Sequence, residues 1–182
     1  MKKIIWYWNV IHYNIFKFER FSQRVINYPV ILLTKIEPIS DFLAKMGNKN
    51  PRKNLEKYTL SKDYSSSSIL ANIHMGGILV LLELSLFCLM QVFIGKSLIQ
   101  YIWENSIIKV LFLLLLIAIP GFFNYFTLFR NEKYLSYFKQ IDKLSKIIKK
   151  RYAWFTILFL SLVLIVFIAS LYFAIKTFSS EY

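Results

Sequence analysis

The sequence predicts an all-α integral membrane protein with three transmembrane helices and an N-terminal amphipathic interfacial helix. Two long uncharged runs carry most of this prediction: residues 152–175 number 24, and residues 110–129 number 20. A bilayer core about 30 Å thick needs roughly 20 helical residues, so each run can cross it. The composition agrees, because 57% of the 182 residues are hydrophobic, whereas soluble domains are about 45–50% apolar.

A third span covers about residues 73–94, although this segment contains the acidic residue Glu83. A charge at the centre of a span costs roughly 2.5–3.5 kcal/mol. Between Ile78 and Ile94 there are 12 residues of Leu, Ile, Val or Phe. At about −0.3 to −0.6 kcal/mol each, they contribute roughly −4 to −7 kcal/mol. The apolar contribution is larger than the cost, so we expect this segment to insert.

The distribution of basic residues predicts the orientation. Lys and Arg number 12 in residues 1–72 and 8 in residues 130–151, against 2 in residues 95–109 and 1 in the tail. The positive-inside rule therefore favours a cytoplasmic N-terminus and an external C-terminus. We also expect no cleaved signal peptide, because no small-residue cleavage site follows the first apolar segment.

Residues 4–26 are predicted to form an amphipathic helix. At 100° per residue, one sector holds Ile4, Tyr7, Trp8, Ile11, Ile15, Phe18 and Val25, and the opposite sector holds Asn9, His12, Glu19, Arg20, Gln23 and Arg24. Ile5, Trp6 and Phe16 are apolar exceptions on the polar side. Such a basic, Trp-containing helix typically lies in the headgroup plane, and packing against the cytoplasmic ends of the spans is the alternative. We expect Pro29 to end this helix.

Two further cytoplasmic helices are predicted. Ser40 is expected to cap a short helix through Met46, with Gly47 following its C-terminus. Residues 133–151 carry apolar side chains at helical spacing, with lysines filling much of the remainder. We expect this second helix to continue into the third span, because no residue between Asp142 and Tyr152 is a strong helix breaker.

Glu83 is the principal candidate site residue, because ionisable residues inside spans are rare and usually functional. It lies near the bilayer midplane, where an unpaired carboxyl is expected to be protonated. Two neutral partners match its depth: Ser161, and the carbonyl of Leu116, which Pro120 leaves without an intrahelical donor. We therefore predict a polar cluster of Glu83, Ser161 and the Leu116 carbonyl. A lock between helices, a contact with a partner protein and a proton or cation pathway are the alternative roles.

The basic residues near the spans predict contact with anionic lipid headgroups, at about 1 kcal/mol for each charge near the surface. They are Lys2, Lys3, Lys17, Arg20, Arg24, Lys146, Lys149, Lys150 and Arg151. No recognisable nucleic-acid-binding module accompanies them. We therefore expect the bilayer, and not a nucleic acid, as the partner of these charges.

The sequence contains no common enzyme signature. The HExxH, GxSxG, GxGxxG and Walker A patterns are absent. The histidines are His12 and His74, and the single cysteine is Cys88. Cys88 falls in the first span and is expected to be an inert packing residue. We therefore expect no enzyme activity, no cofactor and no metal site.

Two stretches carry a resemblance to a known group of proteins. WYWNVIHYNIFKFERFS, near the N-terminus, is aromatic and basic, and NYFTLFRNEKYLSYFKQIDKL, starting at Asn124, precedes the last span. Together they resemble small uncharacterised bacterial inner-membrane proteins with a Tyr/Phe/Lys-rich N-terminus and a "NYF…KYxxYFK" cytoplasmic helix. The resemblance implies a bacterial inner-membrane location, and it implies no activity and no site residues.

We divide the chain into a basic cytoplasmic or interfacial region, residues 1–72, and a three-helix transmembrane region, residues 73–182, with a cytoplasmic helix at 130–151. Three spans with short outer loops leave little room for a self-contained transport path. We therefore expect a non-enzymatic accessory or interaction protein that works in a homo- or hetero-oligomer. The alternatives are a small proton- or cation-conducting component using Glu83, and a holin-like or toxin-like membrane-active protein.

Overall fold

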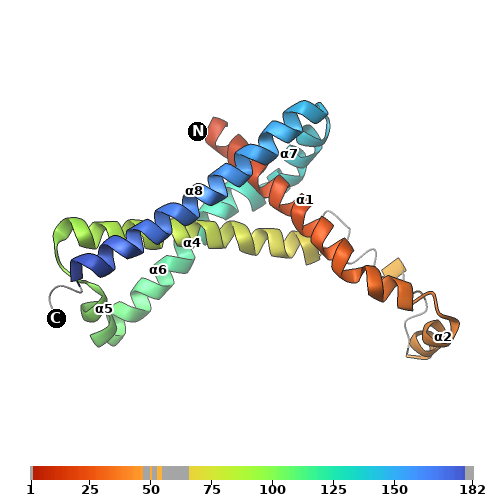
Figure 1. Cartoon of the computed structure of the whole chain (residues 1–182), viewed down its shortest axis with the longest axis horizontal. Coiled ribbons are helices and arrows are strands. Elements are labelled where there is room, and N and C mark those ends of the chain that lie inside the picture. Colours follow the sequence, from red (N-terminus) through yellow and green to blue (C-terminus); the bar gives the residue numbers. More distant parts are fainter. Residues whose placement is uncertain (1, 47–49, 51–52, 55–65, 179–182) are drawn as a thin grey trace. The chain divides into compact units, whose positions relative to one another are not determined.

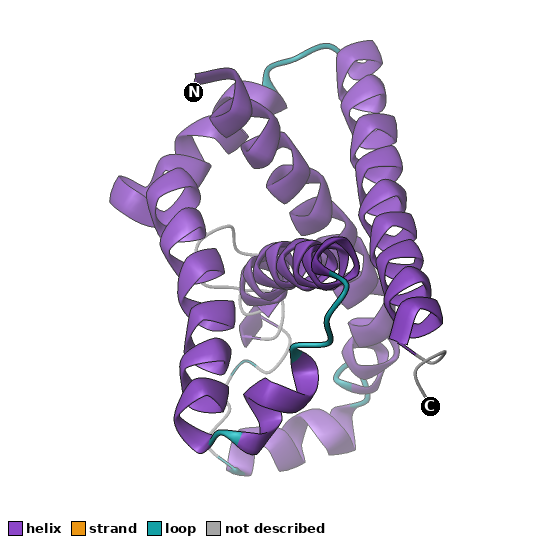
Figure 2. Cartoon of the chain, turned by 90° about the vertical axis from the view of Figure 1, so that its left-hand side faces the viewer, coloured by secondary structure: helices purple, strands orange, loops and turns teal. Residues whose placement is uncertain are grey.

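The computed structural model describes residues 2–46, 50, 53–54 and 66–178, and every regular element in these ranges is a helix (Figure 2). Three helical stretches are long and apolar enough to cross a membrane: Ser67–Ile94, Ser106–Asp142 and Lys146–Phe178. The prediction of an all-α protein with three spanning helices and an N-terminal helix is confirmed. The chain is a multi-pass membrane protein.

The chain divides into two compact units. One consists of Met1–His74 and Tyr134–Lys143, and the other of Met75–Lys133 and Leu144–Tyr182. The first unit therefore combines the N-terminal region with a short segment that lies between the second and third spans in sequence. We describe each unit by itself.

The first unit contains α1 (Lys2–Leu33), α2 (Glu37–Lys45), the first turns of α4 (Ser66–Ile94) and most of α7 (Lys133–Asp142) (Figure 1). α1 continues through Pro29, so the prediction that Pro29 ends this helix is wrong. A proline ring holds φ at a helical value, removes the hydrogen bond to the residue four positions earlier and crowds that residue's carbonyl, which can bend a helix without ending it. Beyond it the helix adds a single turn, and Thr34 N donates to Val30 O at 3.1 Å.

α2 begins at Glu37, four residues earlier than the Ser40 cap predicts. Ile36 is the N-cap, with an extended backbone at φ −80° and ψ 116°, and Pro38 follows in the first turn. Proline is favoured there because the N–H groups of the first turn have no acceptor within the helix, so the absence of an N–H costs no hydrogen bond. Ser40 therefore lies inside the helix and caps nothing, so that prediction is wrong. The predicted role of Gly47 falls outside the described residues.

The second unit contains the rest of α4, α5 (Ile99–Glu104), α6 (Ser106–Asn124), η1 (Tyr125–Phe129), η2 (Arg130–Glu132) and α8 (Lys146–Phe178). Gly95, at φ 71°, follows the last residue of α4 in the left-handed conformation that glycine adopts without strain. The side-chain oxygen of Gln91 then accepts a 2.8 Å hydrogen bond from Leu98 N. These two residues shape the turn that leads into α5.

The stretch from Ser106 to Asp142 is not one uniform α-helix. A five-residue π-helix, η1, follows α6 at Tyr125, and the 3₁₀ turn η2 follows η1. Asn131 and Glu132 have positive φ values of 57° and 52°. Asparagine tolerates this left-handed conformation well, but glutamate adopts it at a cost. These two residues turn the chain between η1 and α7.

α7 and α8 are separate helices, so the predicted continuous helix into the third span is wrong. α7 ends at Asp142 and α8 begins at Lys146. The hydroxyl of Ser145 accepts a 3.4 Å hydrogen bond from Ile148 N, three residues further on. Serine at this position satisfies one of the free N–H groups at a helix start. The break therefore follows from a capping residue that lies between the two apolar patterns.

Candidate functional site: the polar and aromatic junction of α1

Between Trp8 and Phe16, α1 is buried on its predicted polar side as well as on its predicted apolar side. Asn9, His12, Phe16 and Glu19 are all at least 92% buried, whereas Phe18 of the predicted apolar sector is 66% exposed. The four buried residues follow one another at intervals of three or four, so they share a face. Tyr7, Val25 and Ile4 of the predicted sector are also exposed. Trp8, Ile11 and Ile15 of the predicted apolar sector are buried as well, so the prediction is wrong in leaving the polar side of this stretch uncovered.

His12 connects α1 to the start of α4. Its Nε2 lies 2.8 Å from Oδ1 of Asn72, and because a carbonyl oxygen only accepts, Nε2 carries the hydrogen. Nδ1 is buried and has no hydrogen-bond partner among the described residues. Burial lowers the pKa of His12 to about 4, and the hydrogen bond to Asn72 opposes this shift. His12 is therefore a neutral donor at physiological pH.

Phe138 of α7 is the centre of an aromatic cluster against α1. Its ring centroid lies 5.2 Å from the ring centroids of His12, Tyr13 and Phe16. Tyr134 contacts the rings of His12 and Phe138, each at 5.5 Å. Aromatic pairs at these separations contribute about 0.5–1.5 kcal/mol each beyond their buried area. The cluster therefore holds α7 firmly on α1.

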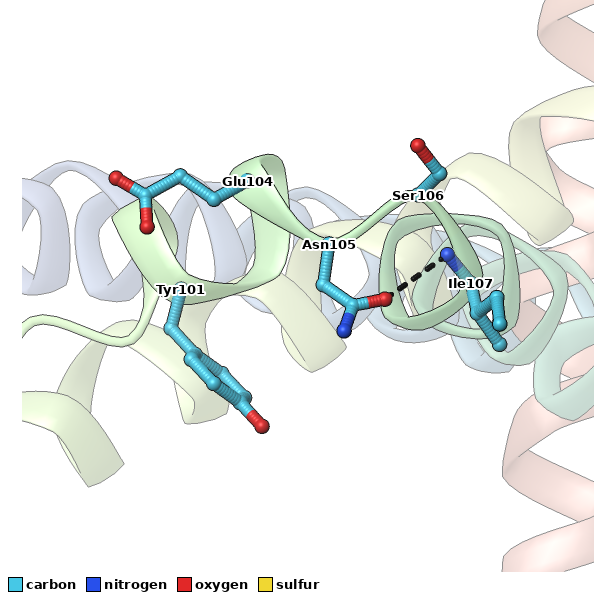
Figure 3. A pocket seen from close by; sticks show the side chains of 5 residues that line it. All are labelled: Tyr101, Glu104, Asn105, Ser106 and Ile107. Atoms are coloured by element: carbon cyan, nitrogen blue, oxygen red, sulfur yellow. Dashed lines mark hydrogen bonds between the residues drawn. The ribbon is translucent and has the colours of Figure 1, made fainter.

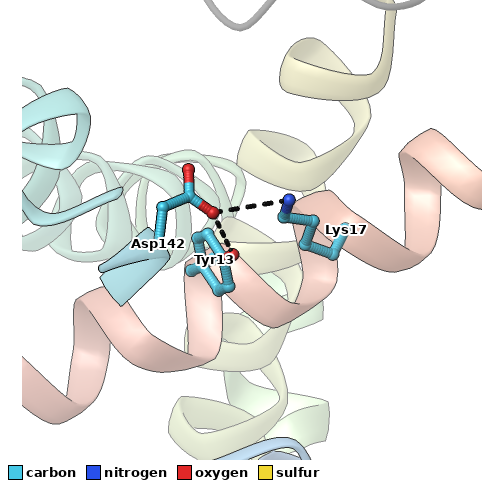
Figure 4. Close-up of polar contacts among 3 residues, drawn as sticks. All are labelled: Tyr13, Lys17 and Asp142. Carbon is cyan, nitrogen blue, oxygen red and sulfur yellow. Dashed lines mark hydrogen bonds and ion pairs between the residues drawn. The ribbon is translucent and has the colours of Figure 1, made fainter. Parts of the chain in front are cut away.

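Asp142, the last residue of α7, receives two side chains from α1 (Figure 4). The Tyr13 hydroxyl donates to Oδ1 at 2.5 Å, and Nζ of Lys17 lies 3.5 Å from the same oxygen. Lys17 also lies 5.2 Å above the centre of the Tyr13 ring. Burial raises the pKa of Tyr13 first, and its hydrogen bond and the negative charge of Asp142 raise it further. The phenol therefore remains a donor throughout the physiological range.

A second polar contact joins α1 to α4 beside His12. Oε1 of Glu19 lies 3.3 Å from Nδ1 of His74. The Glu19 side chain is mostly covered, whereas half of the His74 side chain is exposed. Around these contacts, α4 presents the small buried residues Ser67, Ser68 and Ala71. Small side chains allow helix backbones to approach closely.

We call this set of residues the junction: His12, Tyr13, Phe16, Lys17, Glu19, Asn72, His74, Phe138 and Asp142. It joins three segments that are far apart in sequence and satisfies most of its polar groups internally. Within the described ranges, no three His, Cys, Asp or Glu side chains are placed to hold a metal ion. The arrangement is suited to fixing helices relative to one another within the first unit. The sequence signal for it was the set of apolar exceptions on the polar face, Phe16 above all.

The predicted intramembrane cluster is placed in the second unit but is not joined by hydrogen bonds. Glu83 is half-buried on α4 and Ser161 is exposed on α8. Neither side chain has a hydrogen bond within the described part of the chain. On α6, Leu116 is half-buried and Pro120 is buried. The polar cluster of these four residues therefore stays a prediction.

The predicted lipid-contacting residues have different environments. Lys2, Lys3, Arg24, Lys146, Lys150 and Arg151 are exposed, and Arg20 and Lys149 are half-buried. Lys17 is partly committed to Asp142, and its side chain keeps an exposed fraction of 42%. Most of these charges can therefore reach a headgroup without unfolding any element.

An open pocket of about 480 Å³ lies at the α5–α6 connection (Figure 3). Tyr101, Glu104, Asn105, Ser106 and Ile107 line it. Asn105 is already used as the N-cap of α6, since its side-chain oxygen accepts from Ile107 N at 3.1 Å and Ile108 N at 3.2 Å. Glu104 accepts a 2.8 Å hydrogen bond from the Gln100 amide. The polar groups here serve the local helix ends.

No protein-family model matches this chain, and neither the curated proteins nor the solved structures contain a match. The resemblance noted in the sequence therefore stays a prediction. We therefore infer a function from the fold and from the junction.

Proposed function

We propose that this chain is a non-enzymatic accessory or interaction protein that works within a homo- or hetero-oligomeric membrane complex. The observation that carries the proposal is the exposure of the second span. Only 6% of the most apolar window in Ser106–Asp142 is buried within the chain, against 22% and 17% for the other two spans. A span with so little intramolecular packing has most of its surface available for lipid or for helices of another protein.

The proposal includes a location in a bacterial inner membrane, with the N-terminus cytoplasmic and the C-terminus external. The distribution of Lys and Arg supports this orientation, since 20 of the 23 basic residues fall on the side of the N-terminus. In this orientation the junction lies at the cytoplasmic face. A partner would then meet α6 within the bilayer.

Site-specific photocrosslinking in the native host tests the proposal. A photoreactive residue at Ile117 of α6, which is 70% exposed, is expected to crosslink to one defined protein, either another copy of the chain or a single second species. The matched control is Leu158 of α8, which is 66% exposed and is expected to give weaker crosslinking to that species. Crosslinking to lipid alone at both positions would contradict a membrane complex.

A second candidate function is proton or cation conduction through Glu83. It is favoured by one observation, namely that this half-buried carboxyl has no hydrogen bond within the described residues. If Glu83 has only a structural role, Glu83→Gln should leave abundance and oligomer size unchanged and should not alter flux in liposomes. Loss of a pH-dependent flux in Glu83→Gln at normal abundance would instead support conduction and weaken the accessory role.

A further inference from the structure

The second half of α1 presents a stripe of exposed apolar side chains. The stripe consists of Phe18, Phe21, Val25, Tyr28 and Leu32, whose exposed fractions lie between 41% and 66%. Their spacing of three and four residues places them within an arc of about 80° on a helix with 100° per residue. Towards the N-terminus the stripe is interrupted by Ile11, which is buried. Ile4 and Tyr7 are exposed on the far side of Ile11, so the continuous stripe lies in the half of α1 that extends beyond the junction.

The end of α1 is apolar on several sides. Val30, Leu32 and Leu33 are all exposed, and at 100° per residue they point in three different directions around the helix axis. An end of this kind does not suit water, and it does not suit a partner helix that covers only one side. Lipid at the headgroup boundary can cover several sides of a helix end, because acyl chains and the apolar parts of headgroups adapt to its shape.

The charges on α1 are complementary to an anionic surface. α1 carries five basic residues, Lys2, Lys3, Lys17, Arg20 and Arg24, and a single acidic residue, Glu19. Glu19 is 8% exposed and is paired with His74, so the exposed charges of α1 are basic. Two copies pairing through the stripe would bring these like charges together without an acidic partner on α1.

The junction places α1 beside the start of the first span. His12 and Glu19 contact Asn72 and His74, where the long apolar run of α4 begins. From Glu19 to Leu32, α1 extends about 20 Å further at 1.5 Å per residue. The stripe therefore begins next to the residues of α1 that contact the first turns of this apolar helix.

We propose that residues 18–33 of α1 lie in the headgroup region of an anionic lipid leaflet, with the stripe towards the acyl chains and Arg20 and Arg24 towards the phosphates. Amphipathic helices bind in this way, with the apolar face roughly 5–10 Å below the headgroup boundary. This surface shares Phe18 and Val25 with the predicted interfacial face of residues 4–26, but it continues past residue 26 to Leu32, whereas Trp8, Ile11 and Ile15 of the predicted face are buried. The inference does not depend on any protein partner of the spans.

Spin-label depth measurements on the full chain test this inference. Cys88→Ser removes the single cysteine, and a nitroxide is attached at Phe21→Cys or at the matched position Gln23→Cys on the opposite side of α1. The protein is reconstituted in vesicles of phosphatidylcholine and phosphatidylglycerol. Relaxation by oxygen, which partitions into lipid, is compared with relaxation by a water-soluble nickel chelate. A label at Ile157→Cys, exposed in the α8 span, verifies insertion.

The expected result is a several-fold higher oxygen-to-nickel accessibility ratio at position 21 than at position 23. In vesicles of phosphatidylcholine alone, the ratio at position 21 should fall at least twofold. If position 157 reports lipid while positions 21 and 23 both report water, the inference is overturned. It is also overturned if position 21 is shielded from both reagents and shows spin–spin broadening that disappears on dilution with unlabelled protein, because a second copy then covers the stripe.

Discussion

Tyr13 donates a hydrogen bond of 2.5 Å to Asp142, a residue 129 positions later in the chain. The contact joins the first helix to a segment that lies between the second and third spans in sequence. Lys17, one turn further along α1, lies 3.5 Å from the same oxygen. Asp142 thereby receives a hydroxyl donor and a positive charge from one face of α1, which makes it the polar anchor of the first unit.

Replacing Tyr13 with Phe should lower the free energy of unfolding by about 1–2 kcal/mol, because the carboxylate loses its hydroxyl donor while the ring packing is retained. Denaturant unfolding in detergent, followed by tryptophan fluorescence, measures the change. Tyr101→Phe is the matched control, since this tyrosine is 60% exposed and its replacement should change stability very little. Equal effects of the two variants would contradict the anchoring role of Asp142.

The stability of the first unit should fall on acidification. Burial lowers the pKa of folded His12 from 6.5 to about 4, so the unfolded chain takes up a proton first as the pH falls. The contribution of His12 to the free energy of unfolding is complete above about pH 7 and declines between about pH 6.5 and 4. The total loss is about 3 kcal/mol. His12→Gln keeps a donor for Asn72 but cannot titrate, and its unfolding free energy should lack this pH dependence. An unchanged slope in His12→Gln would show that another group is responsible.

Replacing Asn105 with Ala should destabilise the start of α6 by about 1 kcal/mol, because the N–H groups of Ile107 and Ile108 lose their acceptor. Amide hydrogen exchange should become faster over the first turn of α6 and should be unchanged in α8. Asn105→Asp preserves the acceptor oxygen and should retain protection. Faster exchange in both variants would indicate that the cap does not hold this turn.

A reporter that is active only outside the cytoplasm should be active when fused after Tyr182 and inactive when fused before Met1. The expectation follows from the excess of Lys and Arg on the N-terminal side of the spans. The reverse pattern of activity would overturn the proposed orientation, but it would not contradict the assignment of three membrane-spanning helices.

The spans could be predicted from the sequence because each is an uncharged or nearly uncharged run of sufficient length. The helix boundaries between them were harder to predict, because they depend on single residues. α1 continues through Pro29, although proline favours a break in a helix, and α8 starts anew after α7 where Ser145 caps it. In both places the local hydrogen bonds determine where the helix ends, and the apolar pattern does not reveal them.

The junction could not be predicted because its two sides are separated by most of the chain. From the sequence of α1 by itself, one predicts that Asn9, His12 and Glu19 form a polar face exposed to solvent. Their burial depends on Asn72, His74, Phe138 and Asp142, and no local pattern pairs these residues with α1. Phe16, an apolar residue on that polar face, was the local sign that this side would be covered.

The separation of Tyr13 from Asp142 also has a consequence during synthesis. At about 5–20 residues per second, the ribosome needs roughly 6–26 s to reach Asp142 after it has made Tyr13, given the 129 positions between them. During that interval the aromatic face of α1 has no α7 to cover it. A ten-residue helix such as α7 is too short to be stable alone in water. The aromatic face of α1 is therefore exposed to non-native contacts until α7 has been synthesised. Adsorption of α1 to a nearby lipid surface would cover this face during that interval.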